Sequence, residues 1–233
     1  MVVRKSQQEL IDAINELVKE DALLTPNSYN TQQAYQSYER IGYEGMRWSV
    51  EKRIAEYGLE RLYAKAKQVL DIGSNFGFFT VESALRSGLA HGIEPNPFLI
   101  EIGIKTADHL GVSEQAEFFN CTFEQFINIT QYDLVLSLAA FHTGDGRERS
   151  NADDYFSKVN HLLNDEGRLF FESCSYVKDA ALAQNDSAIQ NQYAKERAKE
   201  AIGRQLVLEE EWETVSGSPG YFRFFAIARK RQD

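Results

Sequence analysis

The chain has 233 residues, of which 35 are acidic and 25 are basic, giving a formal net charge of −10. A hydrophobic share of 43% is enough to build a folded core, which excludes a globally disordered chain. The acidic excess lies after residue 67, and the sequence has no basic region that could make a long contact with a nucleic-acid backbone.

The cellular environment follows from what the sequence lacks. Its two cysteines, Cys121 and Cys174, are too few for a disulfide framework. No uncharged stretch reaches the length of about 18 residues that a transmembrane helix needs. Charged residues such as Asp12 and Lys19 interrupt the region where a signal peptide would be apolar. We therefore expect a cytoplasmic protein without a membrane contact.

The first 67 residues predict a helical cap. Residues 6–20 favour an amphipathic helix because Leu10, Ile14 and Leu17 follow the i, i+4, i+7 spacing. Residues 22–45 are polar and irregular. They include four tyrosines, Tyr29, Tyr35, Tyr38 and Tyr43. A second helical pattern covers residues 50–66.

From residue 68 onward, short apolar runs alternate with helical patterns. The predicted strands are 68–72, 90–94, 116–120, 132–138 and 168–172. The predicted helices are 78–89, 97–110, 153–163 and a short helix or turn at 123–127. Strands that alternate with helices predict a parallel sheet with helices on both faces. We expect residues 68–233 to form this second domain.

The last third departs from the alternation in two ways. Residues 177–203 are a long polar helical stretch, which we interpret as an insertion. Residues 205–212 and 221–229 are joined by a turn sequence at 217–220, which predicts a hairpin and therefore an antiparallel last strand. The predicted fold is α/β, a doubly wound, seven-stranded, mostly parallel sheet with an N-terminal helical cap.

The most informative motif follows the first predicted strand. Asp71 is followed by a turn that contains Gly73, Asn75 and Gly77, at the edge where open α/β sheets bind ligands. The glycine spacing does not fit a dinucleotide fingerprint, and no Gly-Lys-Ser/Thr motif follows. Glu94 ends the next strand, where an acidic residue accepts hydrogen bonds from ribose hydroxyls. The pattern predicts a ligand with a ribose and without a pyrophosphate.

Residues 69–77 resemble motif I of the class I S-adenosylmethionine-dependent methyltransferases, and Glu94 matches the ribose-binding acid of that family. Residues 132–137 resemble its fourth-strand motif, and residues 163–169 resemble the turn before its fifth strand. The similarity spans about residues 68–173. Asn75 departs from the family pattern, which usually has a glycine there. The residues of these motifs are most similar to those of family branches that O-methylate sugars, lipids or secondary metabolites. They also resemble the branch that modifies the wobble uridine of tRNA.

The resemblance implies S-adenosylmethionine as the cofactor. It implies a cofactor site formed by Asp71, Gly73, Ser74, Asn75, Gly77, Glu94, Pro95, Thr122, Phe123, Ser137, Leu138 and Arg47. The two glycines would shape the methionine pocket, and Asp71 would hold the amino end. Thr122 and Phe123 would flank the adenine, and Ser137 and Leu138 would line the path to the methyl group. Thr122 could equally be a helix N-cap.

His142 follows the fourth strand and is the candidate general base, since its near-neutral pKa suits removal of a hydroxyl proton. A structural role for this histidine is an equal alternative. Arg47 or Arg53 could bind the cofactor carboxylate or an anionic substrate. No histidine pair has the spacing of metal ligands, so a metal is not expected.

We expect a small-molecule acceptor that is methylated on a hydroxyl oxygen, selected by residues 1–67 and 177–203. The alternatives are N-methylation of an amine or a peptide, a tRNA substrate, which the net charge opposes, and a cofactor-binding subunit without its own turnover. A homodimer is compatible with the sequence.

Overall fold

The structure is a computed structural model that describes residues 6–25, 34–142, 151–179, 181, 186–216 and 220–232, leaving aside the side chains of residues 142 and 186–192. Tyr29 and most of the predicted hairpin turn, 217–219, lie outside the described residues. The chain divides into two compact units, Met1–Phe126 and Ile127–Asp233.

The first unit combines the cap with the first three strands. Its elements are α1 (Gln7–Leu24), the 3-10 helix η1 (Glu39–Ile41), α2 (Val50–Glu56), α3 (Glu60–Tyr63), β1 (Gln68–Ile72), α4 (Phe78–Ser87), β2 (Leu89–Ile93), α5 (Pro97–Leu110) and β3 (Ala116–Phe119). The three strands are parallel in the order β3-β2-β1, with Ile72 paired with Ile93 and Ile93 paired with Phe119. Their carboxyl ends therefore meet at one edge.

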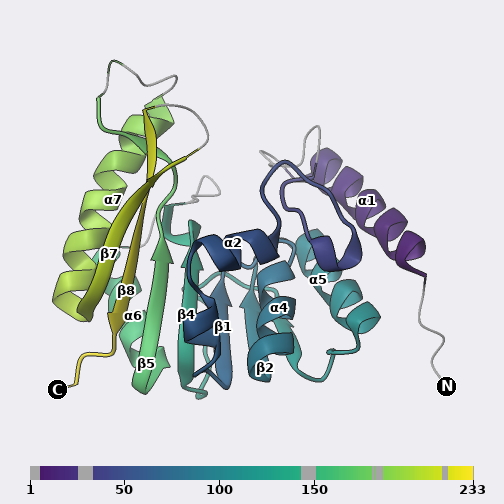
Figure 1. Ribbon diagram of the computed structural model, residues 1–233, viewed down its shortest axis with the longest axis horizontal. Helices are drawn as coiled ribbons and strands as arrows, with labels where there is room; N and C mark the ends of the chain where they lie inside the picture. Colours follow the sequence, from purple (N-terminus) through teal and green to yellow (C-terminus); the bar gives the residue numbers. More distant parts are fainter. Residues whose placement is uncertain are drawn as a thin grey trace. The chain divides into compact units, whose positions relative to one another are not determined.

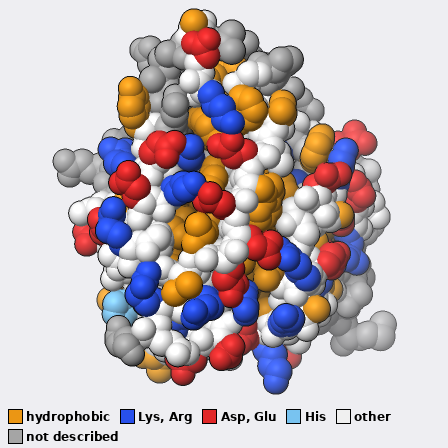
Figure 2. Space-filling view, turned by 60° about the vertical axis from the view of Figure 1, so that its left-hand side comes forward, with side chains coloured by type: hydrophobic (Ala, Val, Ile, Leu, Met, Phe, Trp, Pro, Cys, Tyr) orange, Lys and Arg blue, Asp and Glu red, His pale blue; other side chains and the backbone are white. Residues whose placement is uncertain are grey.

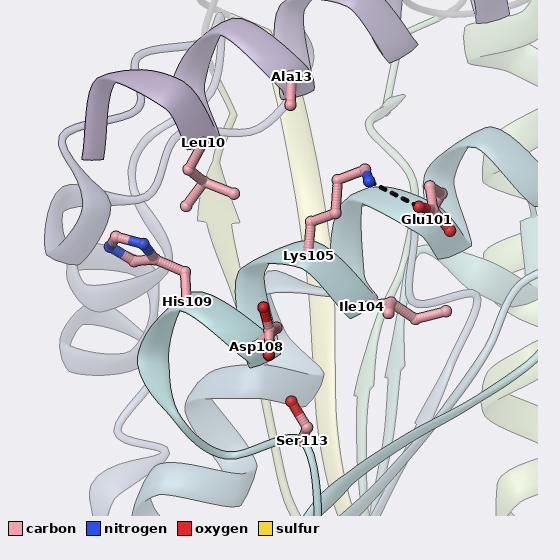
Figure 3. A pocket seen from close by; sticks show the side chains of 8 residues that line it. All are labelled: Leu10, Ala13, Glu101, Ile104, Lys105, Asp108, His109 and Ser113. Atoms are coloured by element: carbon pink, nitrogen blue, oxygen red, sulfur yellow. Dashed lines mark ion pairs between the residues drawn. The ribbon is translucent and has the colours of Figure 1, made fainter. Parts of the chain in front are cut away.

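Helices α4 and α5 pack against the strands of this unit, and α1 lies alongside α5 (Figure 1). Helix α1 begins with a capping box in which Ser6 and Glu9 bond reciprocally, and it buries Leu10, Ile14 and Val18. A pocket of about 290 Å³ remains between the two helices near Leu10 and His109 (Figure 3). The predicted helix 6–20 is confirmed and extends to Leu24.

Two predicted helices are shorter than expected, and a glycine accounts for each difference. The pattern at 50–66 forms two helices, α2 and α3, because Gly58 has φ +66° and interrupts the regular backbone. The predicted helix 78–89 ends at Ser87, since Gly88 has φ +123° and Leu89 already belongs to β2. The residues at 123–127 form a turn and no helix.

The second unit contains the remaining strands. Its elements are β4 (Tyr132–Leu138), the 3-10 helix η2 (Ala140–His142), α6 (Ala152–Leu162), β5 (Leu163–Glu172), β6 (Tyr176–Val177), α7 (Asp186–Gln205), β7 (Val207–Val215) and β8 (Tyr221–Arg229). Strands β4 and β5 are parallel, whereas β8 runs antiparallel to β5 and pairs on its other side with β7. The predicted hairpin and the antiparallel last strand are therefore confirmed.

Three boundaries in the second unit differ from the prediction. The fifth strand begins at Leu163 instead of residue 168, with an irregular register against β4. The stretch predicted as helical at 177–203 starts with a strand residue, Val177, because β6 pairs with the start of β8. Strand β7 covers residues 207–215, three residues beyond the predicted end.

Aromatic side chains build the core of the second unit on the side of α6 and α7. The ring of Phe171 in β5 lies 5.6 Å from that of Phe156 in α6 and 6.2 Å from that of Phe224 in β8. The ammonium of Lys199, in α7, lies 5.8 Å from the centre of the Phe224 ring. These contacts hold both helices against the same face of the strands.

The outer surface of the second unit mixes both signs of charge. Glu209 and Glu211 of β7 pair with Arg168 and Lys199 at 2.8 Å and 2.7 Å. Figure 2 brings this side of the molecule forward, and acidic and basic side chains alternate on it without a large area of one colour. None of the helices in the described part of the chain has the length and apolar character needed to cross a membrane.

Candidate active site

The loop after β1 carries a run of left-handed backbone conformations. Gly73 has φ +67°, Asn75 has φ +53° and Gly77 has φ +72°. Asparagine is one of the few residues other than glycine that adopts this conformation at low cost. The Asn75 side chain also accepts a hydrogen bond from Phe76 N at 2.9 Å. Asn75 therefore supplies the geometry of the glycine that usually stands at this point of the motif.

Gly77 is required by close packing as well as by its backbone angle. A β-carbon at this position would lie 2.5 Å from the ring of Phe118 and 2.9 Å from the α-carbon of Gly103. A β-carbon at Gly103 would likewise lie 2.6 Å from the ring of Phe118. The start of α4 thus approaches α5 and β3 too closely for any side chain.

Glu94 lies directly after β2 and is only 8% exposed. Its Oε2 accepts a hydrogen bond from Asn75 N and its Oε1 accepts one from Asn96 N, each at 3.0 Å. These donors come from two different loops, so the carboxylate has a fixed orientation at the carboxyl edge of the strands. Pro95 separates Glu94 from Asn96 in the chain and is half-buried.

Asp71 is buried at the end of β1, and its Oδ2 accepts a hydrogen bond from Thr80 Oγ1 at 2.8 Å. Burial raises the pKa of this carboxyl to about 6, against the opposing effects of the Thr80 hydroxyl and the Arg53 charge. Ser74, in the same loop, is also buried, and its Oγ would lie 3.0 Å from a β-carbon at Gly92.

The two arginines considered for an anion differ in position. Arg53, on α2, is 3% exposed, with its guanidinium carbon 4.6 Å from the centre of the Phe79 ring. The charge of Arg53 acts on Asp71, as the pKa of that carboxyl records. Arg47 is half-buried and donates a hydrogen bond to the hydroxyl of Tyr35 at 3.0 Å. Arg53 therefore lies near the motif.

A buried carboxylate on α4 was not predicted. Glu82 is fully buried and accepts hydrogen bonds from Tyr38 at 2.6 Å, from Arg40 at 2.8 and 2.9 Å, and from Arg86 at 2.8 Å. Burial opposes its ionisation, but the bonds from Arg40 and Tyr38 hold its pKa below the usual range. Glu82 thereby fastens the cap to α4. The feature of the sequence that could have pointed to this contact is an acidic residue within the apolar pattern of the helix.

Thr122 and Phe123 follow β3 at the same edge of the first unit. Thr122 N donates to Gln125 Oε1 at 3.1 Å, and Gln125 N donates to Thr122 Oγ1 at 3.3 Å, which is the reciprocal pattern of a capping box. Thr122 is half-buried and Phe123 is buried. Phe78 and Phe79 are buried within the first unit, as packing residues would be.

In the second unit, Ser137 and Leu138 end β4. The Ser137 hydroxyl is buried and lies 2.9 Å from that of Tyr155 on α6, whereas Leu138 is partly exposed. Ala139 follows with φ +62°, an unusual angle for an alanine. His142 is the last residue of η2, but its side chain and residues 143–150 lie outside the described residues.

An ion pair at the end of β5 was also not predicted. Glu172 is fully buried, is paired with Leu138 in the register of the strands, and accepts a hydrogen bond from Arg223 at 2.7 Å. Arg223 also donates to the hydroxyl of Ser216 at 3.0 Å. The partners are 51 residues apart in the chain, so no local pattern could have revealed the pair.

Known protein families and solved structures that are similar to this chain identify its family. Residues 64–216 match a family model described as a methyltransferase domain. The N-methyltransferase NodS from Bradyrhizobium japonicum WM9, in complex with S-adenosyl-L-homocysteine, is 14% identical with a TM-score of 0.61, covering 94% of this chain and 99% of that chain. No curated protein sequence matched this chain.

Two further structures are similar over most of their length. Geranyl diphosphate methyltransferase, in complex with GPP and sinefungin, is 11% identical with a TM-score of 0.60, covering 97% of this chain and 99% of that chain. The StiE O-MT structure is 14% identical with a TM-score of 0.58, covering 78% and 74%. At these identities the structures show the shared fold, and the family match covers most of the sequence. The chain thus belongs to the methyltransferase domain family and is a class I S-adenosylmethionine-dependent methyltransferase.

Proposed function

We propose that this methyltransferase binds S-adenosylmethionine at the carboxyl ends of β1 and β2 and transfers its methyl group to a hydroxyl oxygen of a small molecule. The observation that carries the cofactor half is the fixed carboxylate of Glu94. Each of its oxygens accepts a hydrogen bond from a backbone N–H, and a carboxylate oxygen has lone pairs for more than one such bond. A pair of ribose hydroxyls is the matching donor set.

The charge of the loop region supports a nucleoside with a cationic end over a phosphate. Asp71 and Glu94 provide two carboxylates beside a glycine-containing turn, whereas phosphate sites use backbone N–H groups and basic side chains. Gly73 is exposed at this edge and carries no side chain that would obstruct a ligand. The cofactor's sulfonium supplies the activated methyl group, together with its own leaving group.

The residues of this chain would then bind and orient. Asp71 would hold the ammonium of the cofactor, directly or through water, and Arg53 or Arg47 would hold its carboxylate. The turn that contains Gly73, Ser74, Asn75 and Gly77 would enclose the methionine portion. Glu94 and Pro95 would border the ribose, Thr122 and Phe123 would flank the adenine, and Ser137 and Leu138 would line the path to the methyl group.

Isothermal titration with S-adenosylhomocysteine tests this cofactor site. The unmodified protein should bind the ligand, and Glu94→Gln should weaken binding by about tenfold, since hydrogen bonds to a charged group contribute about 1.5–3 kcal/mol. Glu114→Gln, an exposed acid of the same unit, is the matched control and should bind normally. Equal affinity for the Glu94 variant would contradict the ribose assignment.

The acceptor oxygen needs a base, and His142 is our candidate because it follows β4 at the end of η2. The StiE O-MT structure supports an oxygen acceptor, whereas NodS, an N-methyltransferase, favours nitrogen as the second candidate. Matched hydroxyl and amine compounds, assayed for labelled methyl transfer, separate the two. A hydroxyl substrate whose turnover loses its pH dependence near neutrality in His142→Ala supports our proposal. Turnover of amines alone would replace it with N-methylation.

A further inference from the structure

We propose that Asp21, on helix α1 of the cap, is a positioning residue for the ribose of the cofactor, acting through Asn96 on Glu94. This inference rests on the proposed function, in which Glu94 binds the ribose hydroxyls. It extends that function by giving α1 a part in cofactor binding, whereas the sequence assigned the cap to substrate selection.

The first link joins α1 to the loop after β2. Asp21 is 1% exposed, and its Oδ1 accepts a hydrogen bond from Asn96 Nδ2 at 2.6 Å. The two residues are 75 positions apart in the chain, so the contact depends on how α1 packs along α5. A bond this short to a carboxylate is of the stronger, charge-assisted type.

The second link joins Asn96 to Glu94, the proposed ribose-binding residue. The backbone N–H of Asn96 donates to Glu94 Oε1 at 3.0 Å, while its side-chain oxygen accepts from Phe98 N at 3.0 Å and caps α5. The side-chain oxygen is thus used by the helix and the side-chain nitrogen by Asp21. With both ends of its amide held, Asn96 keeps its N–H directed at Glu94.

The position of Asp21 is costly, which argues against a passive role. Leu10, Ile14, Val18 and Asp21 form the buried stripe of α1, so the carboxylate stands where the pattern calls for another apolar side chain. It also lies in the last turn of the helix, where the backbone dipole disfavours negative charge. Packing alone would be served better by leucine at this position.

The other end of the same interface is apolar on the side of α1. Ala13 and Leu10 face Lys105 and His109 across the pocket between α1 and α5 (Figure 3). The ammonium of Lys105 forms an ion pair at 2.8 Å with Glu101, which lies on the same helix, α5. The hydrogen bond from Asn96 to Asp21 is therefore a specific tie between the cap and the cofactor loop.

The test compares two ligands in three variants by isothermal titration. The ligands are S-adenosylhomocysteine and its 2′,3′-dideoxy analogue, which lacks the hydroxyls that Glu94 would bind. Asp21→Leu removes the acceptor and keeps the apolar stripe, Asp21→Asn retains an acceptor oxygen, and Asp12→Leu is a control on the exposed face of α1. Thermal unfolding checks each variant, and Asp21→Ala replaces Asp21→Leu if the latter does not fold.

We expect Asp21→Leu to weaken S-adenosylhomocysteine by about fivefold to tenfold, in line with one lost hydrogen bond, and to leave the dideoxy analogue unchanged. Asp21→Asn and Asp12→Leu should both stay within about twofold of the unmodified protein. In the Glu94→Gln background, Asp21→Leu should add no further loss, because both act through the same contact.

The results that would overturn this inference differ from those that would overturn the proposed function. Equal weakening of both ligands by Asp21→Leu would make Asp21 a helix brace and overturn the inference, as would no weakening of either. Either result leaves the cofactor site intact if Glu94→Gln still weakens S-adenosylhomocysteine. If the unmodified protein does not bind that ligand, or Glu94→Gln binds it equally well, the proposed function itself fails and the inference fails with it.

Discussion

Replacing Asp71 by asparagine should remove a pH dependence from the stability of the ligand-free protein. Asp71 is buried, and the pKa of its carboxyl is raised to about 6 from a reference value of 3.8. Between these values the folded protein binds a proton that the unfolded chain has already released. Stability therefore falls as pH rises through this window and stays at its lower level above it.

The size of the effect follows from the two pKa values. A difference of about two units, at 1.36 kcal/mol per unit, corresponds to about 3 kcal/mol of unfolding free energy. Asparagine has nearly the same shape, and its side-chain oxygen can still accept the hydrogen bond from Thr80. The Asp71→Asn variant should gain up to about 3 kcal/mol relative to the unmodified protein between about pH 4 and pH 7.

Urea unfolding of both proteins at several pH values from about 4 to about 8 measures this difference directly. Every other titrating group is present in both proteins, so the difference between them isolates Asp71. Asp108→Asn, on the exposed surface of α5, is the control for removing a carboxylate. A stability difference that stays constant with pH would refute the reasoning, because it would mean that Asp71 titrates alike in the folded and unfolded states.

The same substitution should also weaken the binding of S-adenosylhomocysteine, the product that the cofactor leaves after methyl transfer. If Asp71 holds the ammonium of the ligand, Asp71→Asn should reduce S-adenosylhomocysteine affinity by about tenfold or more, the scale of a hydrogen bond between charged groups. The variant would then be more stable above pH 6 and bind more weakly, a trade between stability and function. Unchanged affinity would remove Asp71 from the binding residues.

Three further predictions concern the packing around the site. Gly77→Ala should cost at least about 3 kcal/mol in urea unfolding because its β-carbon meets Phe118 and Gly103, whereas Gly58→Ala, with the same backbone strain and open space, should cost only about 1–2 kcal/mol. Equal costs would show that packing at Gly77 is looser than described. Glu82→Gln should lower the unfolding free energy by about 1.5–3 kcal/mol, since the hydrogen bonds from Arg40 and Arg86 lose their charged acceptor, and an unchanged stability would contradict the buried ion pair. Asn75→Gly should keep S-adenosylhomocysteine affinity within about threefold because the N–H to Glu94 remains, whereas Asn75→Val should lose both stability and affinity, and a valine variant that binds normally would argue against the left-handed turn.

The local part of the candidate site could be predicted from the sequence. The turn after β1 and the acid after β2 are each defined within a few residues, and their chemistry follows from glycine, asparagine and carboxylate properties. The left-handed angle at Asn75 explains how the motif tolerates a residue other than glycine. The alternation of apolar runs and helices was likewise enough for the fold class.

The contacts between distant segments could not be predicted. Glu82 meets Tyr38 and Arg40 across 44 and 42 residues of chain, and Glu172 meets Arg223 across 51. Such pairs depend on tertiary packing, which periodicity does not encode. Helix ends were misjudged for a related reason, since Gly58 and Gly88 interrupt helices only where their positive φ angles are realised.

If the cap selects the acceptor, as we expect from the sequence, its attachment at Glu82 constrains any redesign of that choice. Exchanging residues 34–57 for the corresponding piece of another methyltransferase would remove the phenol and the guanidinium that Tyr38 and Arg40 present to this acid. A chimera made in that way would leave the enclosed carboxylate with its contact to Arg86 but without those to Tyr38 and Arg40. A transplanted segment should therefore carry both side chains along, or be combined with an apolar replacement of the acid on α4.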